Sequence, residues 1–453
     1  MRSFLLVVAV LLLATVACAQ PYAVIVSEAT LATPGWGEVV QAALDKHSGT
    51  LVTYQGEAFP RSVKRELSRL RPEYCCFVGQ LVELGEEYVR RAHQLTRALD
   101  ADPWGDAVWA ILTGARPEDA LRQLEAPPLR VESGLLKTCG GWLNQLTSGE
   151  YHSEANLTEH WLKQAGGVLQ QPNDGPEDDT PALVDALNQG RADFVVTSGH
   201  AWPDGWQLHY PTADPEGYFL ADNGTLYGLD NAKRRLDILS TNPKIIYAVG
   251  NCLAGRLTQP NCLAAGWLGS GGAVQFAGYT VETWFGYMGW GVASYFLDLQ
   301  DQYTFAEASF LINQALLFEE RHPLPDSNQE GLAYDRDVWA LYGDPAYEAR
   351  LPRVTEPLYE QSIERLPAEK PGQVRLRLMV KLNRAARLGK PVIWRLPVRL
   401  LEARLVSGPG EVEVADDLVL ARFSQPGEPE LPAGTRIKLV IEGLEASDLP
   451  PAL

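Results

Sequence analysis

The sequence predicts a mainly parallel α/β sheet flanked by helices, followed by a small all-β sandwich. Three observations predict this fold class. Short apolar runs without alternation recur over the first three quarters of the chain, stretches with helical spacing of apolar residues lie between them, and short runs separated by Pro and Gly follow. Continuous apolar runs are typical of parallel strands that are covered on both faces. Strands that alternate with helices indicate right-handed crossovers.

The expected strands of the α/β part are the buried runs Tyr22–Ser27, Leu51–Tyr54, Tyr74–Gly79, Ala107–Thr113, Asp193–Ser198, Lys244–Gly250 and Gly272–Ala277. Helices are expected where apolar residues recur every three or four positions, over Gly37–Lys46, Arg61–Arg71, Pro117–Leu124 and Phe305–Glu320. The acidic, turn-rich segment Gln170–Thr180 is expected to be a surface loop.

The length of 453 residues exceeds what one ordinary domain core uses. We therefore expect a signal peptide over residues 1–19, an α/β domain over 20–350, a linker rich in Pro and charge over 351–370, and a β-sandwich over 371–453. One interpretation divides the α/β domain further, into subdomains at about 20–125 and 126–350.

The N-terminus indicates export. Arg2 precedes the apolar stretch Phe4–Val16, and small residues around Cys18 offer a cleavage site. An alternative interpretation makes Cys18 a lipid-anchored cysteine at the cell surface. The stretch is short for a membrane span, and no stable span is expected elsewhere. The net charge of -18 argues against nucleic acid as a partner, and the oligomeric state stays open.

The cysteine pattern argues against a disulfide scaffold and against a structural zinc site. Five cysteines follow the signal peptide, namely Cys75, Cys76, Cys139, Cys252 and Cys262. This number is too low for a disulfide scaffold, and an odd count leaves at least one thiol unpaired. There is no Cys-x-x-Cys, and the seven histidines show no ligand spacing along the chain. We therefore expect no structural zinc site. No organic cofactor is expected, and a structural calcium ion stays open although no sequence signature demands one.

Two predicted strands end in residues that can carry chemistry. The first runs into Ser-Gly-His at His200, and the second runs into Gly-Asn-Cys at Cys252. Sites gather at the carboxyl ends of parallel strands, so neighbouring strands would place these side chains across one cleft. An imidazole can take the proton of a thiol, and the thiolate can then attack a carbonyl carbon. Gly199, Gly250 and Gly255 leave backbone N–H groups accessible to an oxyanion.

The same segments resemble the gingipains, cysteine peptidases related to caspases. IIYAVGNC followed by QPNC is similar to their nucleophile region, and the strand that ends in Ser-Gly-His is similar to their histidine motif. ALYGDP resembles the end of their catalytic domain, and ADPWGD followed by LTGARP resembles an upstream pattern. The resemblance spans roughly residues 22–350, and a C-terminal immunoglobulin-like sandwich is a further gingipain feature. It implies a caspase/gingipain-like fold and a secreted cysteine endopeptidase that acts on protein or peptide substrates.

The resemblance implies roles for individual residues. His200 would be the general acid and base, Cys252 the nucleophile, and the backbone around Gly199, Ala201 and Asn251 would surround the oxyanion. Ala201 departs from the family, where glycine usually follows the histidine. The segment after the nucleophile strand would form the substrate pocket, with Trp284, Tyr287 and Glu282 as its candidate residues. Since aromatic residues dominate that segment, we do not transfer the family's basic specificity and expect apolar or aromatic side chains instead.

Alternatives remain open from the sequence alone. A cysteine at a strand end is often structural, and Cys252 could form a disulfide with Cys262. The acid that orients His200 is unassigned, with Asp102, Asp106 and Asp230 as candidates. A transpeptidase would resolve the same acyl-enzyme with an amine. A surface binding protein could retain the fold without catalysis.

Overall fold

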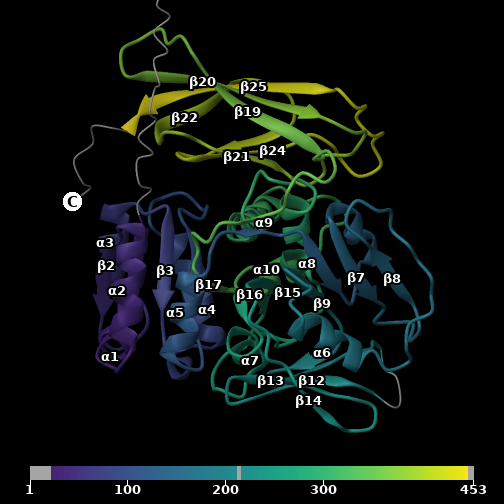
Figure 1. Ribbon diagram of the computed structural model, residues 1–453. Helices are drawn as coiled ribbons and strands as arrows, with labels where there is room; N and C mark the ends of the chain where they lie inside the picture. The colour runs from purple at the N-terminus through teal and green to yellow at the C-terminus, as the bar shows by residue number, and fades with distance from the viewer. Residues whose placement is uncertain (1–21, 212–215, 447–453) are drawn as a thin grey trace, which may run out of the picture.

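A computed structural model describes residues 22–211 and 216–446 of the protein (Figure 1). The predicted signal peptide, with Cys18, lies outside these residues. In the described part, no helix combines the length and the apolar character that crossing a bilayer requires. The chain forms a large α/β part and, after it, a smaller part made of two antiparallel sheets.

One sheet of eleven strands organises the α/β part. Its order is β2-β1-β3-β4-β17-β16-β15-β9-β6-β7-β8, and its pairs are parallel except β16–β17 and β7–β8. The strands are β1 (Tyr22–Ser27), β2 (Thr50–Tyr54), β3 (Tyr74–Val78), β4 (Val108–Leu112), β6 (Ser133–Leu136), β7 (Ser148–His152), β8 (His160–Lys163), β9 (Phe194–Thr197), β15 (Lys244–Ala248), β16 (Ala273–Tyr279) and β17 (Trp339–Gly343). All seven predicted strands are present, so the predicted fold class is confirmed.

Helices cover both faces of this sheet. Successive residues of β1 show the division, since Val24 and Val26 belong to one apolar core and Ala23 and Ile25 to the other. The first core is covered by α2 (Trp36–His47), α5 (Pro117–Glu125), α8 (Tyr287–Phe296), α9 (Phe305–Arg321) and α10 (Gln329–Asp335). The second is covered by α3 (Arg61–Leu70), α4 (Glu86–Thr96), α6 (Thr180–Asn188) and α7 (Leu263–Leu268).

The four predicted helices are confirmed as α2, α3, α5 and α9. Helix α9 begins with a capping box, in which the Thr304 side chain accepts from the Glu307 amide and the Glu307 carboxylate accepts from the Thr304 amide. The short elements that complete this part are α1 (Glu28–Leu31), η1 (Leu81–Glu83), η2 (Gly140–Gln145) and the strand pair β5 (Leu129–Arg130) and β18 (Ala349–Arg350).

A five-stranded antiparallel sheet is inserted between β9 and β15. It comprises β10 (Ala201–Trp202), β11 (Gly205–Gln207), β12 (Tyr218–Asp222), β13 (Thr225–Leu229) and β14 (Arg235–Asp237). This insertion begins directly after His200. It therefore borders the edge of the main sheet where β9 and β15 end.

The C-terminal part contains two antiparallel sheets whose inner residues form one core. The first has the order β19-β20-β25-β22, with β19 (Tyr359–Leu366), β20 (Gln373–Leu382), β25 (Arg436–Glu445) and β22 (Leu400–Ser407). The second has the order β21-β24-β23, with β21 (Val392–Arg395), β24 (Leu418–Arg422) and β23 (Glu411–Val414). Alternate residues of β20 are buried, as expected for a strand with one covered face. The prediction of a linker over 351–370 is wrong for its middle part, because the whole of β19 lies inside it and pairs with β20.

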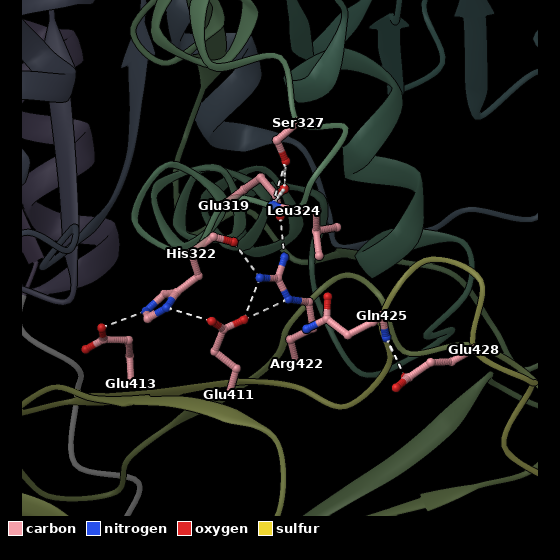
Figure 2. A network of polar contacts seen from close by, with 9 residues as sticks. All are labelled: Glu319, His322, Leu324, Ser327, Glu411, Glu413, Arg422, Gln425 and Glu428. Atoms are coloured by element: carbon pink, nitrogen blue, oxygen red, sulfur yellow. Dashed lines mark hydrogen bonds and ion pairs between the residues drawn. The ribbon is translucent and has the colours of Figure 1, made fainter.

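Ion pairs join the two parts at the C-terminal end of α9 (Figure 2). Arg422 of β24 is almost fully buried and donates to the Glu319 carboxylate of α9 at 2.7 Å and to the Glu411 carboxylate of β23. His322, directly after α9, lies between the carboxylates of Glu411 and Glu413, at 3.0 and 2.7 Å. The sandwich is thereby fixed to α9, which lies between the sandwich and the main sheet (Figure 1).

Candidate active site

Strands β9 and β15 are parallel neighbours in the main sheet. Their register runs from Phe194 opposite Ile245 to Thr197 opposite Ala248. The two strands therefore end side by side, and the segments that carry His200 and Cys252 leave the same edge of the sheet. The sequence analysis had to assume that these two strands are neighbours, and in the structure they are.

Both side chains line one cleft of about 280 Å³ at this edge. His200 is exposed and Cys252 is partly exposed. The cleft is lined by Glu154, Ser198, Gly199, His200, Tyr210, Gly250, Cys252, Thr283, Trp284, Phe285, Gly286 and Trp290. The Tyr210 ring stands edge-on to the His200 imidazole, with 4.8 Å between ring centroids. Solvent can therefore reach the thiol and the imidazole in the same cleft.

The Cys252 thiol is free. Its sulfur lies 3.6 Å from the Thr283 carbonyl oxygen, to which the thiol donates. Cys262 is buried at the start of α7, and its sulfur accepts from the Thr258 amide at 3.4 Å. All five cysteines of the described residues are unpaired, so Cys252 and Cys262 form no disulfide.

Asn251 connects the two segments that border the cleft. Its side chain is buried, its Oδ1 accepts from the Thr197 hydroxyl at 2.5 Å, and its Nδ2 donates to the Gly199 carbonyl at 3.2 Å. Gly199 has φ +84, and a Cβ there would lie 3.0 Å from the Tyr210 side chain. The backbone next to His200 is therefore held by a side chain next to Cys252.

Ala201 is the first residue of β10 and is buried opposite Trp206 of β11. The Trp206 indole donates to the Ser198 carbonyl at 2.8 Å, which ties the inserted sheet to the end of β9. Ala201 thus directly follows the cleft residue His200, but it is not itself among the residues that line the cleft.

Glu154 is a cleft residue that the sequence analysis missed. It follows β7, and its carboxylate accepts from the Ser198 hydroxyl. Its backbone N–H donates to the Lys137 carbonyl at 3.0 Å, and its carbonyl accepts from the Tyr210 amide at 2.7 Å. Strand β7 has the mixed sequence SGEYH without an apolar run, so no pattern in the sequence indicated that this turn reaches the site.

Three aromatic side chains of the segment after β16 form part of the cleft wall. Trp284 and Trp290 are exposed, at 56% and 39%, and Phe285 lies between them in the chain. Tyr287 begins α8 and stacks on Phe285, with the Lys390 ammonium 5.3 Å from its ring centroid. Neither Tyr287 nor Glu282 is among the residues that line the cleft.

The three aspartates considered for orienting His200 lie elsewhere. The Asp106 carboxylate faces Arg399 at 3.5 Å, and that of Asp230 accepts from Arg234 at 2.7 Å. The Asp102 carboxylate accepts from the Trp104 amide. Among the residues that line the cleft, Glu154 supplies the carboxylate.

The buried carboxylate of Asp335 binds the chain on both sides of the aromatic segment that lines the cleft. Asp335 accepts from the Met288 amide in the first turn of α8 at 2.6 Å and from the Tyr279 hydroxyl at 3.2 Å. It is fully buried, and burial raises the pKa of this carboxyl to about 6. The charged form thus costs stability in the folded protein.

This raised pKa predicts a pH-dependent stability. The contribution of Asp335 is fully present below its unfolded pKa, near 3.8, and is lost as the pH rises through about 6. Replacement by Asn keeps an acceptor for the Met288 amide and removes the ionisation. The free energy of unfolding of Asp335→Asn, minus that of the unchanged protein, should therefore increase between about pH 4 and pH 7. Urea denaturation at a series of pH values measures this difference, and a difference independent of pH would contradict the assignment.

Comparison with known proteins finds similar structures but no similar sequences. No protein-family model matches the chain, and no curated protein sequence matches it. The crystal structure of the Arg-specific cysteine proteinase gingipain R (RgpB) is similar with a TM-score of 0.46 and 12% identity, over 91% of this chain and 92% of that one. The complex of Porphyromonas gingivalis RgpB pro- and mature domains is similar with a TM-score of 0.46 and 11% identity, over 90% and 94%. At these values nothing about activity follows from the likeness.

Proposed function

We propose that the protein is a secreted cysteine endopeptidase in which His200 and Cys252 form the catalytic pair. One observation carries the proposal: a free thiol and an imidazole leave the ends of adjacent parallel strands and line the same accessible cleft. Cys75, Cys76 and Cys262 are buried, as structural cysteines usually are, and of the two partly exposed cysteines, Cys139 and Cys252, it is Cys252 that lines the cleft.

The proposed reaction is acyl transfer through a covalent intermediate. His200 takes the proton of Cys252, and the thiolate attacks the carbonyl carbon of a peptide bond. His200 then gives the proton to the departing amine, which leaves an acyl group on the sulfur. Water hydrolyses this thioester, again with His200 as the base. Backbone N–H groups at Cys252 and beside Gly199 are the proposed donors to the oxyanion.

Asn251 and Glu154 are assigned supporting roles. The two hydrogen bonds of Asn251 hold the Gly199 main chain against the β15 end, which keeps the proposed oxyanion donors in place. Glu154 adds a negative charge on the side of the cleft that carries His200. In the proposed reaction, this carboxylate would stabilise the positive charge that His200 carries after it accepts the thiol proton.

The lining also bears on specificity. We propose that Trp284, Phe285 and Trp290 contact the substrate side chain next to the scissile bond and favour apolar or aromatic residues. A peptide-library cleavage profile measures this preference. A profile dominated by Arg and Lys would instead indicate that Glu154 sets the specificity.

Covalent labelling tests the catalytic pair. A peptidyl acyloxymethyl ketone reacts with an activated thiolate, so the full chain should acquire one label on Cys252, located by peptide mass spectrometry. Cys139 is the matched control, because it is the other partly exposed cysteine of the described residues and burial raises its pKa. Cys139→Ala should keep the label, and Cys252→Ala should lose it. An unlabelled protein, or equal labelling of both cysteines, would contradict the proposal.

Product analysis separates hydrolysis from transpeptidation. A hydrolase should release a free carboxyl terminus even when a large excess of an amine nucleophile is present. Predominant amide products under these conditions would show that the acyl-enzyme is resolved by amines.

A further inference from the structure

A cluster of two histidines and a glutamate lies on the β7–β8 hairpin, at the edge of the main sheet. Glu150 and His152 are two residues apart on β7, so their side chains share a face. His160 of β8 is directly opposite His152 in the antiparallel register. The two imidazole rings have centroids 4.6 Å apart. One potential ligand atom from each of the three side chains lies within 4.8 Å of the others.

The polar atoms of this cluster are only partly satisfied. His152 is 3% exposed, and its Nε2 lies 3.4 Å from Glu150 Oε2. The Nε2 atom of His160 is buried and has no hydrogen-bond partner among the described residues. A buried nitrogen without a partner lowers the stability of the fold, because it has lost its contact with water and gained no hydrogen bond. A cation bound to the cluster would contact an imidazole nitrogen of His160 and the Glu150 carboxylate at the same time.

The surroundings supply groups that orient the ligands. The Nδ1 atom of His152 lies 4.0 Å from the Asp179 carboxylate, which Lys137 holds at 2.6 Å. Arg191 pairs with the second oxygen of Glu150 and leaves Oε2 facing His152. Carboxylates commonly face the far nitrogen of a metal-bound histidine and fix its ring. Lys137 and Arg191 offset part of the negative charge of Asp179 and Glu150. This would weaken metal binding, but it would not block the ligand atoms.

We propose that Glu150, His152 and His160 form a binding site for a divalent transition-metal ion of the Zn²⁺ type. Two imidazole nitrogens and one carboxylate oxygen are a ligand set that Zn²⁺ and Co²⁺ accept, with the remaining position left to water. Oxygen-preferring cations such as Ca²⁺ and Mg²⁺ do not suit this set. None of the three residues lines the cleft, so the site does not depend on the proposed peptidase activity.

Metal titration of the full chain tests the site. Because a thiol and an imidazole can also bind zinc, the titration uses Cys252→Ala as the background. Co²⁺ is the probe, since its visible absorption reports the ligands, and Zn²⁺ is titrated in competition. We expect one Co²⁺ per chain, and the substitution His160→Gln should weaken its affinity by about tenfold or more. The matched control His47→Gln, a histidine of α2 that faces Asp344, should change the affinity less than about twofold.

A second variant guards against loss of folding. If His160→Gln does not fold, as judged by circular dichroism without metal, Glu150→Gln takes its place, with the same weakening expected. The proposal is overturned if the background protein binds neither ion at concentrations up to about 1 mM. It is also overturned if the folded ligand variant binds Co²⁺ as tightly as the background protein does.

Discussion

Replacing Cys252 by Ala will lower kcat/KM for a cleaved peptide by about 10⁴-fold or more. The variant loses the nucleophile, and no other described thiol lines the cleft. His200→Ala should cause a loss of similar size, because the thiol then lacks its base. The double variant should be little worse than either single one, since the two groups act as a unit.

Kinetics with an internally quenched peptide, chosen from the library profile, measure these losses. Cys139→Ala is again the control and should retain kcat/KM within about threefold, because that thiol does not line the cleft. Full activity of Cys252→Ala would remove the assigned nucleophile. Additive losses in the double variant would show that His200 and Cys252 contribute independently.

Arg422→Met will destabilise the protein by about 3–5 kcal/mol. The guanidinium is almost fully buried between Glu319 and Glu411, and Met retains much of its apolar stem (Figure 2). The loss arises mainly because the Glu319 carboxylate keeps its burial and loses its cation. A compensating substitution, Glu319→Gln in the same chain, should recover part of the stability.

Urea denaturation followed by tryptophan fluorescence measures the change in the free energy of unfolding. Arg377→Met is the matched control on the same sandwich, since Arg377 pairs with Glu364 at 2.7 Å and the two side chains are 37% and 59% exposed. That variant should lose less than about 1 kcal/mol. Equal effects of the two substitutions would show that burial adds nothing to the Arg422 pairs.

The main sheet could be predicted from sequence where its strands are buried on both faces. Residues of β1 and β3 are buried throughout and form unbroken apolar runs. Strand β7 is partly exposed and has the sequence SGEYH, so neither a run nor an alternation marks it. Strand β17 is apolar, but its place depends on contacts far apart in the sequence, since it is parallel to β4 and antiparallel to β16.

The candidate site could also be predicted from the sequence only in part. His200 and Cys252 directly follow strands with clear patterns, so their placement required only that β9 and β15 be neighbours. Glu154 reaches the cleft through the sheet order β9-β6-β7, which local pattern does not fix. The cluster of Glu150, His152 and His160 arises from a cross-strand register, and spacing along the chain does not reveal it.

The late position of β17 in the chain has a consequence for biosynthesis. This strand lies between β4 and β16, so it joins the N-terminal strands of the sheet to the rest, yet it is among the last segments of the α/β part to be translated. The strands β1, β2, β3 and β4 of a nascent chain can pair early. The free edge of β4 stays open until β17 has emerged. An unpaired edge of this kind invites association with other chains, so we expect premature termination before β17 to yield aggregating products.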